Sequence, residues 1–273
     1  MKKRILFDRS AFHGTQFDLL LNSPLLELSK QRRISIYHSP ILIEETTQMY
    51  LKQKNRGELR RQLPFIFEIC QERWLNERTQ IWIKELVEDA GERGSIFLPD
   101  GKRRQIEGNL SRMVFQDDVD AAMFEEAIRG VDDNRAKAAK IKESAVRMRE
   151  EISRQLKEHR LSRKNIKQTA GEYVNAVLDD TGVEIIKKHL PVSNTLEISE
   201  KWKCKKERYP YFTHFARGLL YSGYYAMAYP NEAIDDNALT DISLLCYAHG
   251  MDLMVSNEEG FMKKAFDFMF AGK

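Results

Sequence analysis

The 273-residue sequence has few cysteines, little glycine or proline, and no long apolar run. Its three cysteines, Cys70, Cys204 and Cys246, include no Cys-x-x-Cys pair, which disfavours a disulfide framework and a cysteine zinc site. With 14 Gly and 7 Pro the chain is neither collagen-like nor of low complexity. No segment approaches the roughly 18 apolar residues of a membrane span, and the apolar run near the N-terminus is too short for a signal peptide. We therefore expect a soluble, cytoplasmic protein that contacts no membrane.

Several common enzyme motifs are also missing. There is no Gly-x-x-x-x-Gly-Lys-Ser/Thr loop, so a P-loop ATPase is excluded. No Gly-x-Gly-x-x-Gly follows the first apolar run, and no Gly-x-Ser-x-Gly elbow occurs, so neither a dinucleotide oxidoreductase nor an α/β-hydrolase is supported. A haloacid-dehalogenase-type phosphatase would need a second Asp two residues after Asp8, where this chain has Ser10.

Charge is balanced overall but segregated along the chain. The net charge is only +3, from 44 Lys and Arg against 41 Asp and Glu. Residues 117–133 carry seven acids and one base, whereas residues 135–167 carry twelve bases and four acids. The basic stretch either binds phosphates, with salt-sensitive affinity, or packs against the acidic stretch in the same or another subunit. With a second basic cluster at 201–208, it supplies the candidate nucleic-acid-binding residues, which are Lys140, Arg147, Arg149, Arg154, Lys203 and Lys205.

Both ends of the chain have α/β character. Residues 4–8, an apolar run ending in an acid, and residues 34–37 predict short strands, and Ser39-Pro40 opens a predicted helix over 41–53. Strand, helix and strand at this spacing predict a parallel sheet. Near the C-terminus, the pattern predicts an apolar helix over 241–249, a buried strand over 252–256 and a last helix over 260–270.

The intervening sequence is mainly helical in pattern. It predicts a helix over 17–28 interrupted at 23–24, two helices within 63–90, a long helix or two within 135–167, a helix running towards 178, and a packed helix over 209–229. Residues 95–106 differ, because Pro99-Asp100-Gly101-Lys102 is a turn signal between two apolar runs. We therefore expect a β-hairpin there.

Acidic residues follow the predicted strands. Asp8 ends the first, Glu44 and Glu45 lie in the helix after the second, and further acids flank the last helix–strand pair, namely Asp235, Asp236, Asp241, Glu258 and Glu259. The carboxyl ends of parallel strands share one edge, where ligands bind. Crowded carboxylates repel one another, and Mg²⁺ or Mn²⁺ removes that cost through oxygen ligands. The sequence therefore predicts a divalent metal site capable of phosphodiester cleavage.

Four sequence blocks around these acids resemble those of PIN-domain ribonucleases. The blocks are ILFDRS at 5–10, SPILIEE at 39–45, LTDISLL at 239–245 and LMVSNEEGF at 253–261. The resemblance implies a three-layer α/β/α fold and metal-dependent endonuclease activity on RNA, leaving a 5′-phosphate and a 3′-hydroxyl. Asp8, Glu45 and Asp241 fall on its acidic positions, and Ser10 and Ser256 on its hydroxyl positions.

The chain departs from the family pattern at its last acid, which is Glu258 beside Asn257 where the family usually has Asp. In the predicted site, Asp8 and Asp241 ligate metal, with Asp236 the alternative to Asp241. Glu45 and Glu258 hold the metal or its waters. Ser10 and Ser256, with Asn257, orient carboxylates or bind phosphate.

The sequence therefore predicts an α/β, PIN-like domain with a central parallel sheet, formed by residues 1–94 and 206–273 and split by a helical insertion at 95–205. We expect a metal-dependent endoribonuclease acting on single-stranded RNA. A second copy of the chain and a protein inhibitor, as in toxin–antitoxin pairs, are further expected partners. The alternative is a catalytically degraded PIN-like module that binds RNA or assembles proteins.

Overall fold

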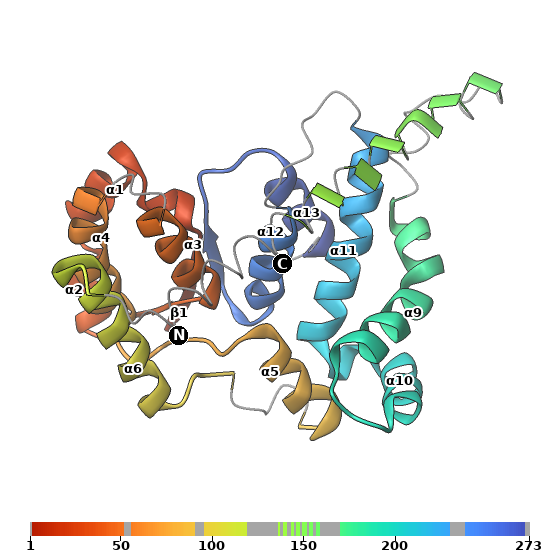
Figure 1. The fold of residues 1–273 in the computed structure, drawn as a ribbon, viewed down its shortest axis with the longest axis horizontal. Helices are drawn as coiled ribbons and strands as arrows, with labels where there is room; N and C mark the ends of the chain where they lie inside the picture. Colours follow the sequence, from red (N-terminus) through yellow and green to blue (C-terminus); the bar gives the residue numbers. More distant parts are fainter. Residues whose placement is uncertain are drawn as a thin grey trace. The chain divides into compact units, whose positions relative to one another are not determined.

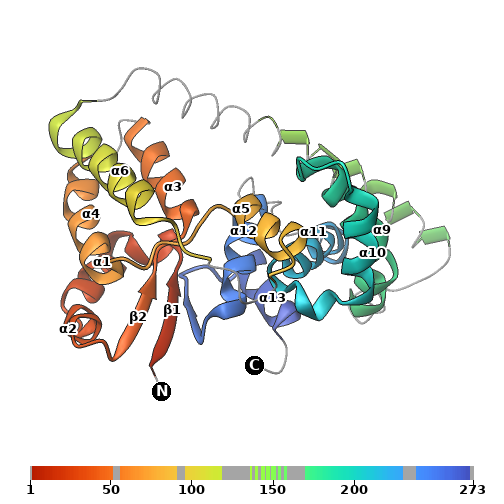
Figure 2. The same ribbon diagram turned by 90° about the horizontal axis from the view of Figure 1, so that it is seen from below.

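The computed structural model of the chain describes residues 2–51, 56–90, 96–118, 170–229 and 238–270, with scattered residues between 136 and 158 (Figures 1 and 2). The chain divides into two compact units. Unit 1 comprises Met1–Glu77, Ser95–Asn134 and Gly250–Asn257, and unit 2 comprises Arg78–Gly94, Arg135–His249 and Glu258–Lys273. No helix in the described ranges is long and apolar enough to cross a membrane.

Unit 1 contains a three-stranded parallel sheet in the order β2-β1-β3, formed by β1 (Lys3–Phe7), β2 (Ile34–Tyr37) and β3 (Leu253–Val255). β1 is central and lies beside β2 (Figure 2). Its pairing with β3 joins residues about 250 positions apart, with Ile5 opposite Leu253. Because the strands are parallel, the residues that follow them emerge at one edge of the sheet.

Helices accompany the sheet in unit 1. They are η1 (Arg9–Phe12), α1 (Gly14–Leu21), α2 (Leu25–Lys30), α3 (Pro40–Leu51), α4 (Arg56–Cys70), α6 (Asp100–Ser111) and η4 (Arg112–Gln116). α2 and α4 pack against β2. The core joins apolar side chains of β1, such as Phe7, to Phe12 and Phe17 and to Ile66 of α4. The Ser39 hydroxyl accepts a hydrogen bond from the Leu42 amide (3.3 Å), so its predicted capping role is confirmed.

The predicted hairpin over 95–106 is wrong. Pro99 has an extended backbone (φ −59°, ψ 141°), and α6 begins directly after it at Asp100. An acid suits the first turn of a helix, and the Arg103 guanidinium pairs with Glu107 one turn later at 2.8 Å. Ile106 and Leu110, four residues apart, pack on the same cluster of unit 1. The helical spacing of these apolar residues therefore outweighs the local turn signal.

The predicted strand near residue 254 exists, but its predicted burial is wrong. β3 is the edge strand of the sheet, and Leu253 is 51% exposed. Its Met254 and Val255 are only partly buried. A short apolar run predicts a buried strand when the strand is assumed to pair on both sides. Here β1 is its one partner in the sheet.

The regular elements described in unit 2 are all helices. Its elements are α5 (Arg78–Trp82), η2 (Ile83–Val87), α9 (Ala170–His189), α10 (Thr195–Cys204), η5 (Lys206–Arg208), α11 (Pro210–Ala228), α12 (Ala238–Tyr247), η6 (Ala248–Gly250) and α13 (Phe261–Met269). α11 packs against α9, α12 and α13 (Figure 1). Trp82 and Trp202 each meet the Phe212 ring edge-to-face, with ring centroids about 5 Å apart.

Most predicted elements are therefore confirmed, together with the broad α/β character of the chain. The two helices separated near 23–24, the strand at 34–37 and the helices at both ends of the chain are all present. The described residues between 136 and 158 are helical, as predicted. The acids from 119 to 133, the expected break near 159–162, Asp235 and Asp236 lie outside the described residues. The three-layer PIN-like arrangement stays a prediction.

Candidate functional site

Asp8 lies at the carboxyl end of the central strand and is buried. Its Oδ1 atom accepts a hydrogen bond from the Arg9 amide at 2.6 Å, so Asp8 caps η1. Its Oδ2 atom accepts hydrogen bonds from the hydroxyls of Ser256, at 2.9 Å, and Ser10. Three donors from the ends of two strands therefore fix this carboxylate at the sheet edge.

Hydrogen bonds donated by backbone amides join the segments that follow β1 and β3. The Asp8 amide donates to the Val255 carbonyl at 2.9 Å, and the Asn257 amide donates to the Ser10 hydroxyl at 2.9 Å. The two serine hydroxyl oxygens are 3.3 Å apart. Each hydroxyl has one proton to donate, and both hydroxyls lie within hydrogen-bonding distance of Asp8 Oδ2. This geometry favours the carboxylate-orienting role of Ser10 and Ser256 over donation to a phosphate.

Arg9 is a member of this site that the sequence analysis missed. Its side chain is buried, and it reaches from η1 to the two helices α3 and α4. The Nη2 atom donates to Gln62 Oε1 on α4 and lies 2.7 Å from Met49 Sδ on α3. The one feature of the sequence that could have indicated its burial is its position between Asp8 and the apolar residues Ala11 and Phe12 of η1.

Two glutamates accompany Arg9, one on each helix. Glu58 precedes Gln62 by one turn and accepts a hydrogen bond from its Nε2 atom at 2.6 Å. Glu45 precedes Met49 by one turn of α3, so both side chains lie on the same helix face. Burial lowers the pKa of the Arg9 guanidinium, and the charges of three carboxylates oppose that shift, namely those of Glu45, Glu58 and Asp8.

The structure also separates Glu45 from its neighbour. Glu45 is partly buried and interacts electrostatically with Arg9, whereas Glu44 is exposed on another face of α3. The sequence left both as candidates for the helix acid. The geometry assigns Glu45, rather than Glu44, to the charged cluster of unit 1.

His38 follows β2 at the same edge but is fully enclosed. Its ring stacks on Trp74 with centroids 3.9 Å apart and planes 6° from parallel. Burial lowers the pKa of His38 to about 3, so the ring is neutral at physiological pH. His38 is therefore a buried packing residue that stays unprotonated at that pH in the folded chain, and it is not an accessible base.

The remaining predicted acids belong to unit 2. Asp241 is buried in the first turn of α12, where the helix dipole favours a carboxylate. Glu258 is partly buried and directly follows Asn257, whose side chain is exposed. Asp236 lies outside the described residues.

The donors gathered at the edge of unit 1 are oxygen atoms, which suits Mg²⁺ or Mn²⁺. The number of these donors is too small for a metal site. Within the ranges that the structure describes, no three His, Cys, Asp or Glu side chains form a group that could hold a metal ion. A metal site therefore needs acids beyond Asp8 and Glu45. The sequence assigns Asp241 and Glu258 to that role, and this assignment stays a prediction.

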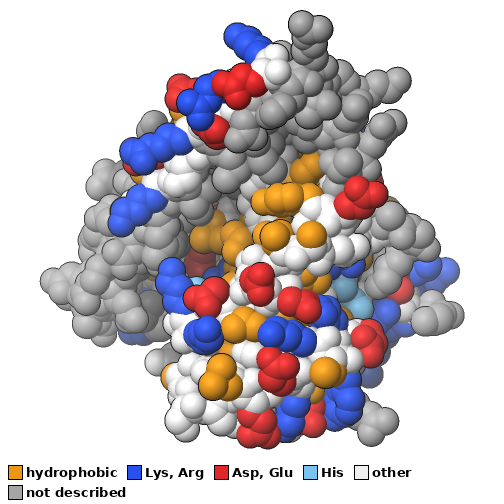
Figure 3. Space-filling view, turned by 90° about the vertical axis from the view of Figure 1, so that its right-hand side faces the viewer, with side chains coloured by type: hydrophobic (Ala, Val, Ile, Leu, Met, Phe, Trp, Pro, Cys, Tyr) orange, Lys and Arg blue, Asp and Glu red, His pale blue; other side chains and the backbone are white. Residues whose placement is uncertain are grey.

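The predicted nucleic-acid-binding residues have different surroundings. Arg147 pairs with Glu143, Arg154 pairs with Glu151, and Lys203 pairs with Glu200 at 3.1 Å. Figure 3 shows acidic and basic side chains interspersed on one face of the molecule. Solvent weakens exposed pairs of this kind, so these bases can exchange their carboxylate partner for a phosphate. Two predicted residues, Lys140 and Lys205, are exposed.

Arg149 differs from the other basic residues. Its Nε atom donates to the Ala226 carbonyl at 2.6 Å and its Nη2 atom to the Tyr229 carbonyl at 3.1 Å. These carbonyls lie at the C-terminal end of α11, where helices leave acceptors without intrahelical donors. Arg149 therefore caps α11, a structural role that the charge pattern alone could not reveal.

Comparison of the chain with protein-family models, with curated proteins and with solved structures finds no match. Its function must therefore be inferred from the side chains of the sheet edge.

Proposed function

We propose that the chain is a metal-dependent endoribonuclease that hydrolyses RNA phosphodiester bonds at the carboxyl edge of its sheet. One observation carries this proposal. Asp8 ends the central strand of a parallel sheet, and hydroxyls that follow both β1 and β3 orient its carboxylate. Ligands of open parallel sheets bind at this edge. The same residues carry the resemblance to PIN-domain ribonucleases.

Each side chain of the proposed site has its own role. Asp8 presents a fixed carboxylate, and Ser10 and Ser256 prevent it from rotating. Glu45 adds a second carboxylate on α3, and Asp241 and Glu258 complete the proposed donor set. A Mg²⁺ or Mn²⁺ ion held by these carboxylates would supply activation of a water molecule and charge stabilisation of the leaving oxygen.

Exposed bases would hold the RNA. Lys140 and Lys205 are exposed, and Arg147 and Arg154 lie in surface ion pairs that a phosphate can replace. Each phosphate contact adds to the salt dependence of binding. Arg149 is excluded from this set because its guanidinium caps α11.

A second candidate function is a PIN-like module that binds RNA without cutting it. The buried Arg9 guanidinium favours it, because this cation already offsets carboxylate repulsion at the edge. The carboxylates could then persist without a metal. The departure at Glu258 points the same way.

The decisive experiment measures Mn²⁺-dependent cleavage of single-stranded RNA by the wild type, Asp8→Asn and Asp241→Asn. Each substitution should lower the rate about a hundredfold or more, since a metal-holding carboxylate is lost. Glu45→Gln should also lower it, while its exposed neighbour provides the matched control, Glu44→Gln, with wild-type activity. Equal activity in all variants, or cleavage without metal, would refute the nuclease. Salt-sensitive RNA binding by an inactive wild type would establish the binding module.

A further inference from the structure

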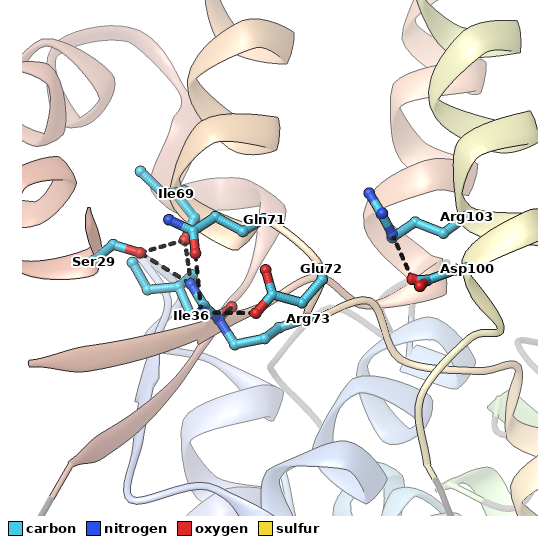
Figure 4. Close-up of polar contacts among 8 residues, drawn as sticks. All are labelled: Ser29, Ile36, Ile69, Gln71, Glu72, Arg73, Asp100 and Arg103. Carbon is cyan, nitrogen blue, oxygen red and sulfur yellow. Dashed lines mark hydrogen bonds and ion pairs between the residues drawn. The ribbon is translucent and has the colours of Figure 1, made fainter. Parts of the chain in front are cut away.

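Unit 1 buries two arginines, Arg9 and Arg73, which are 5% and 8% exposed. Figure 4 shows that Arg73 lies among neutral oxygen atoms and one carboxylate, that of the exposed Glu72 at 3.9 Å. Its guanidinium donates to the carbonyls of Ile36 and Ile69, both at 3.1 Å, and to the Ser29 hydroxyl at 3.0 Å. These bonds join β2, α2 and the end of α4, so Arg73 acts as a structural clamp.

Arg9 has fewer hydrogen bonds and more charge around it. Its Nη2 atom contacts Gln62 and Met49, but among the described residues its Nε and Nη1 atoms have no hydrogen-bond partner. A buried N–H group without a partner is costly. Hydrogen bonding alone therefore does not account for the burial of this side chain.

The three elements that Arg9 joins each bring one carboxylate. η1 is capped by Asp8, α3 carries Glu45 one turn before Met49, and α4 carries Glu58 one turn before Gln62. The charges of all three carboxylates act on the Arg9 guanidinium, and a buried cation near like charges reduces the repulsion between them. The same attraction compensates Arg9 for its lost hydration.

We propose that Arg9 is the internal counter-cation of the sheet edge, a positioning residue that holds Asp8, Glu45 and Glu58 in place before any metal ion binds. This inference rests on the proposed function for the role of Asp8 and Glu45. It deepens that function, because a site arranged in advance loses less conformational freedom when a cation enters. It also means that unit 1 folds without metal, whereas a chain without this guanidinium would depend on a divalent cation.

The test measures the melting temperature of the full chain in EDTA and in Mn²⁺, for the wild type, Arg9→Gln and Arg73→Gln. Both substitutions should lower the Tm in EDTA by roughly 6–12 °C, since each removes a buried, partnered charge. Mn²⁺ should restore much of the loss in Arg9→Gln and give Arg73→Gln only the wild-type response. An equal Mn²⁺ response in the two variants would overturn the proposal.

A second variant covers the case in which Arg9→Gln does not fold. Removing one of the opposing charges should then restore folding in Arg9→Gln/Glu45→Gln, because less repulsion is left without compensation. Failure to restore folding would show that Arg9 acts through packing and hydrogen bonds instead.

These melting experiments are independent of cleavage. If Mn²⁺ selectively stabilises Arg9→Gln while the wild type cuts no RNA, the counter-cation stands and the nuclease proposal fails. If the wild type cuts RNA but Arg9→Gln and Arg73→Gln respond alike, only the role of Arg9 is refuted.

Discussion

The ends of α11 in unit 2 and the sheet edge of unit 1 hold buried polar side chains in different ways. At α11 these side chains bind backbone: the Glu85 carboxylate accepts the amides of Tyr211 and Phe212, both at 2.9 Å, at the start of the helix. Arg149 binds carbonyls at the other end of the same helix. In unit 1 the polar groups of the sheet edge bind one another, as Asp8 binds two serine hydroxyls.

This difference distinguishes side chains that stabilise the fold from side chains that we expect to act in function. A side chain at a helix end forms hydrogen bonds with backbone amides or carbonyls that have no partner within the helix. Its burial is explained without any ligand. Ser10 and Ser256 instead place their polar contacts on a carboxylate at a strand end rather than on a helix end. Such an arrangement is expected where a protein holds reactive groups in a set geometry.

The largest effect is expected from Gly182→Ala in unit 2. A Cβ atom there would lie 2.0 Å from the Trp202 ring, whose Nε1 atom is held by the Thr213 hydroxyl at 2.9 Å. We expect a loss of about 3 kcal/mol or more in urea denaturation. The control is Gly171→Ala on the same helix, where a Cβ atom meets nothing within 4 Å. That control should lose no stability, since the added Cβ atom meets nothing, and a similar loss in both variants would contradict the packing assignment.

Glu85→Gln should cost slightly less. The substitution removes the charge that strengthens two hydrogen bonds and leaves one acceptor for the two amides. We expect a loss of about 1.5–3 kcal/mol in the free energy of unfolding. The exposed Glu88 gives the matched control, Glu88→Gln, which should change stability by less than about 0.5 kcal/mol.

The stability of unit 1 should fall in mild acid because of His38. The unfolded chain binds a proton near the ordinary histidine pKa of 6.5, whereas the folded chain does so only near pH 3. Stability that is present above pH 6.5 is therefore lost as the pH falls, by about 2 kcal/mol at pH 5. His38→Phe should flatten this part of the pH–stability curve, and an unchanged slope would exclude His38 as its source.

Ser256→Ala should have the smallest effect on stability and a larger one on activity. Losing its hydrogen bond to Asp8 should cost about 1 kcal/mol in denaturation and lower RNA cleavage roughly tenfold. Ser222→Ala in unit 2 removes a hydroxyl that donates to the Leu219 carbonyl at 2.7 Å. Ser222→Ala should change stability about as much as Ser256→Ala does and should leave RNA cleavage unchanged. A loss of cleavage in both variants would remove the distinction between the two units.

The sequence predicted best those features that are set by local pattern. The strand at 34–37 agrees with the structure because it is rich in the β-branched and aromatic residues that favour strands. Ser39 caps the next helix as its residue type suggests. The association of Asp8 with Ser10 and Ser256 was predictable because parallel strand ends share an edge. Pro99-Asp100 misled because the same residues can begin a helix.

The rest depends on contacts that no local pattern encodes. Arg9 was not among the predicted site residues, and its burial comes from α3 and α4, which lie about 40 and 50 residues further along the chain. Arg149 belonged to a basic stretch, yet it binds carbonyls about 80 residues away. Long-range neighbours decide whether a charged residue meets solvent, a helix end or another charge.

Calorimetric titration of Mn²⁺ into the full chain tests most directly whether the sheet edge is a metal-dependent active site. The wild type and Glu44→Gln should bind Mn²⁺ alike, and Asp8→Asn should bind it about a hundredfold more weakly or not at all. Wild-type affinity in Asp8→Asn, or no binding by the wild type, would contradict the central role of this carboxylate.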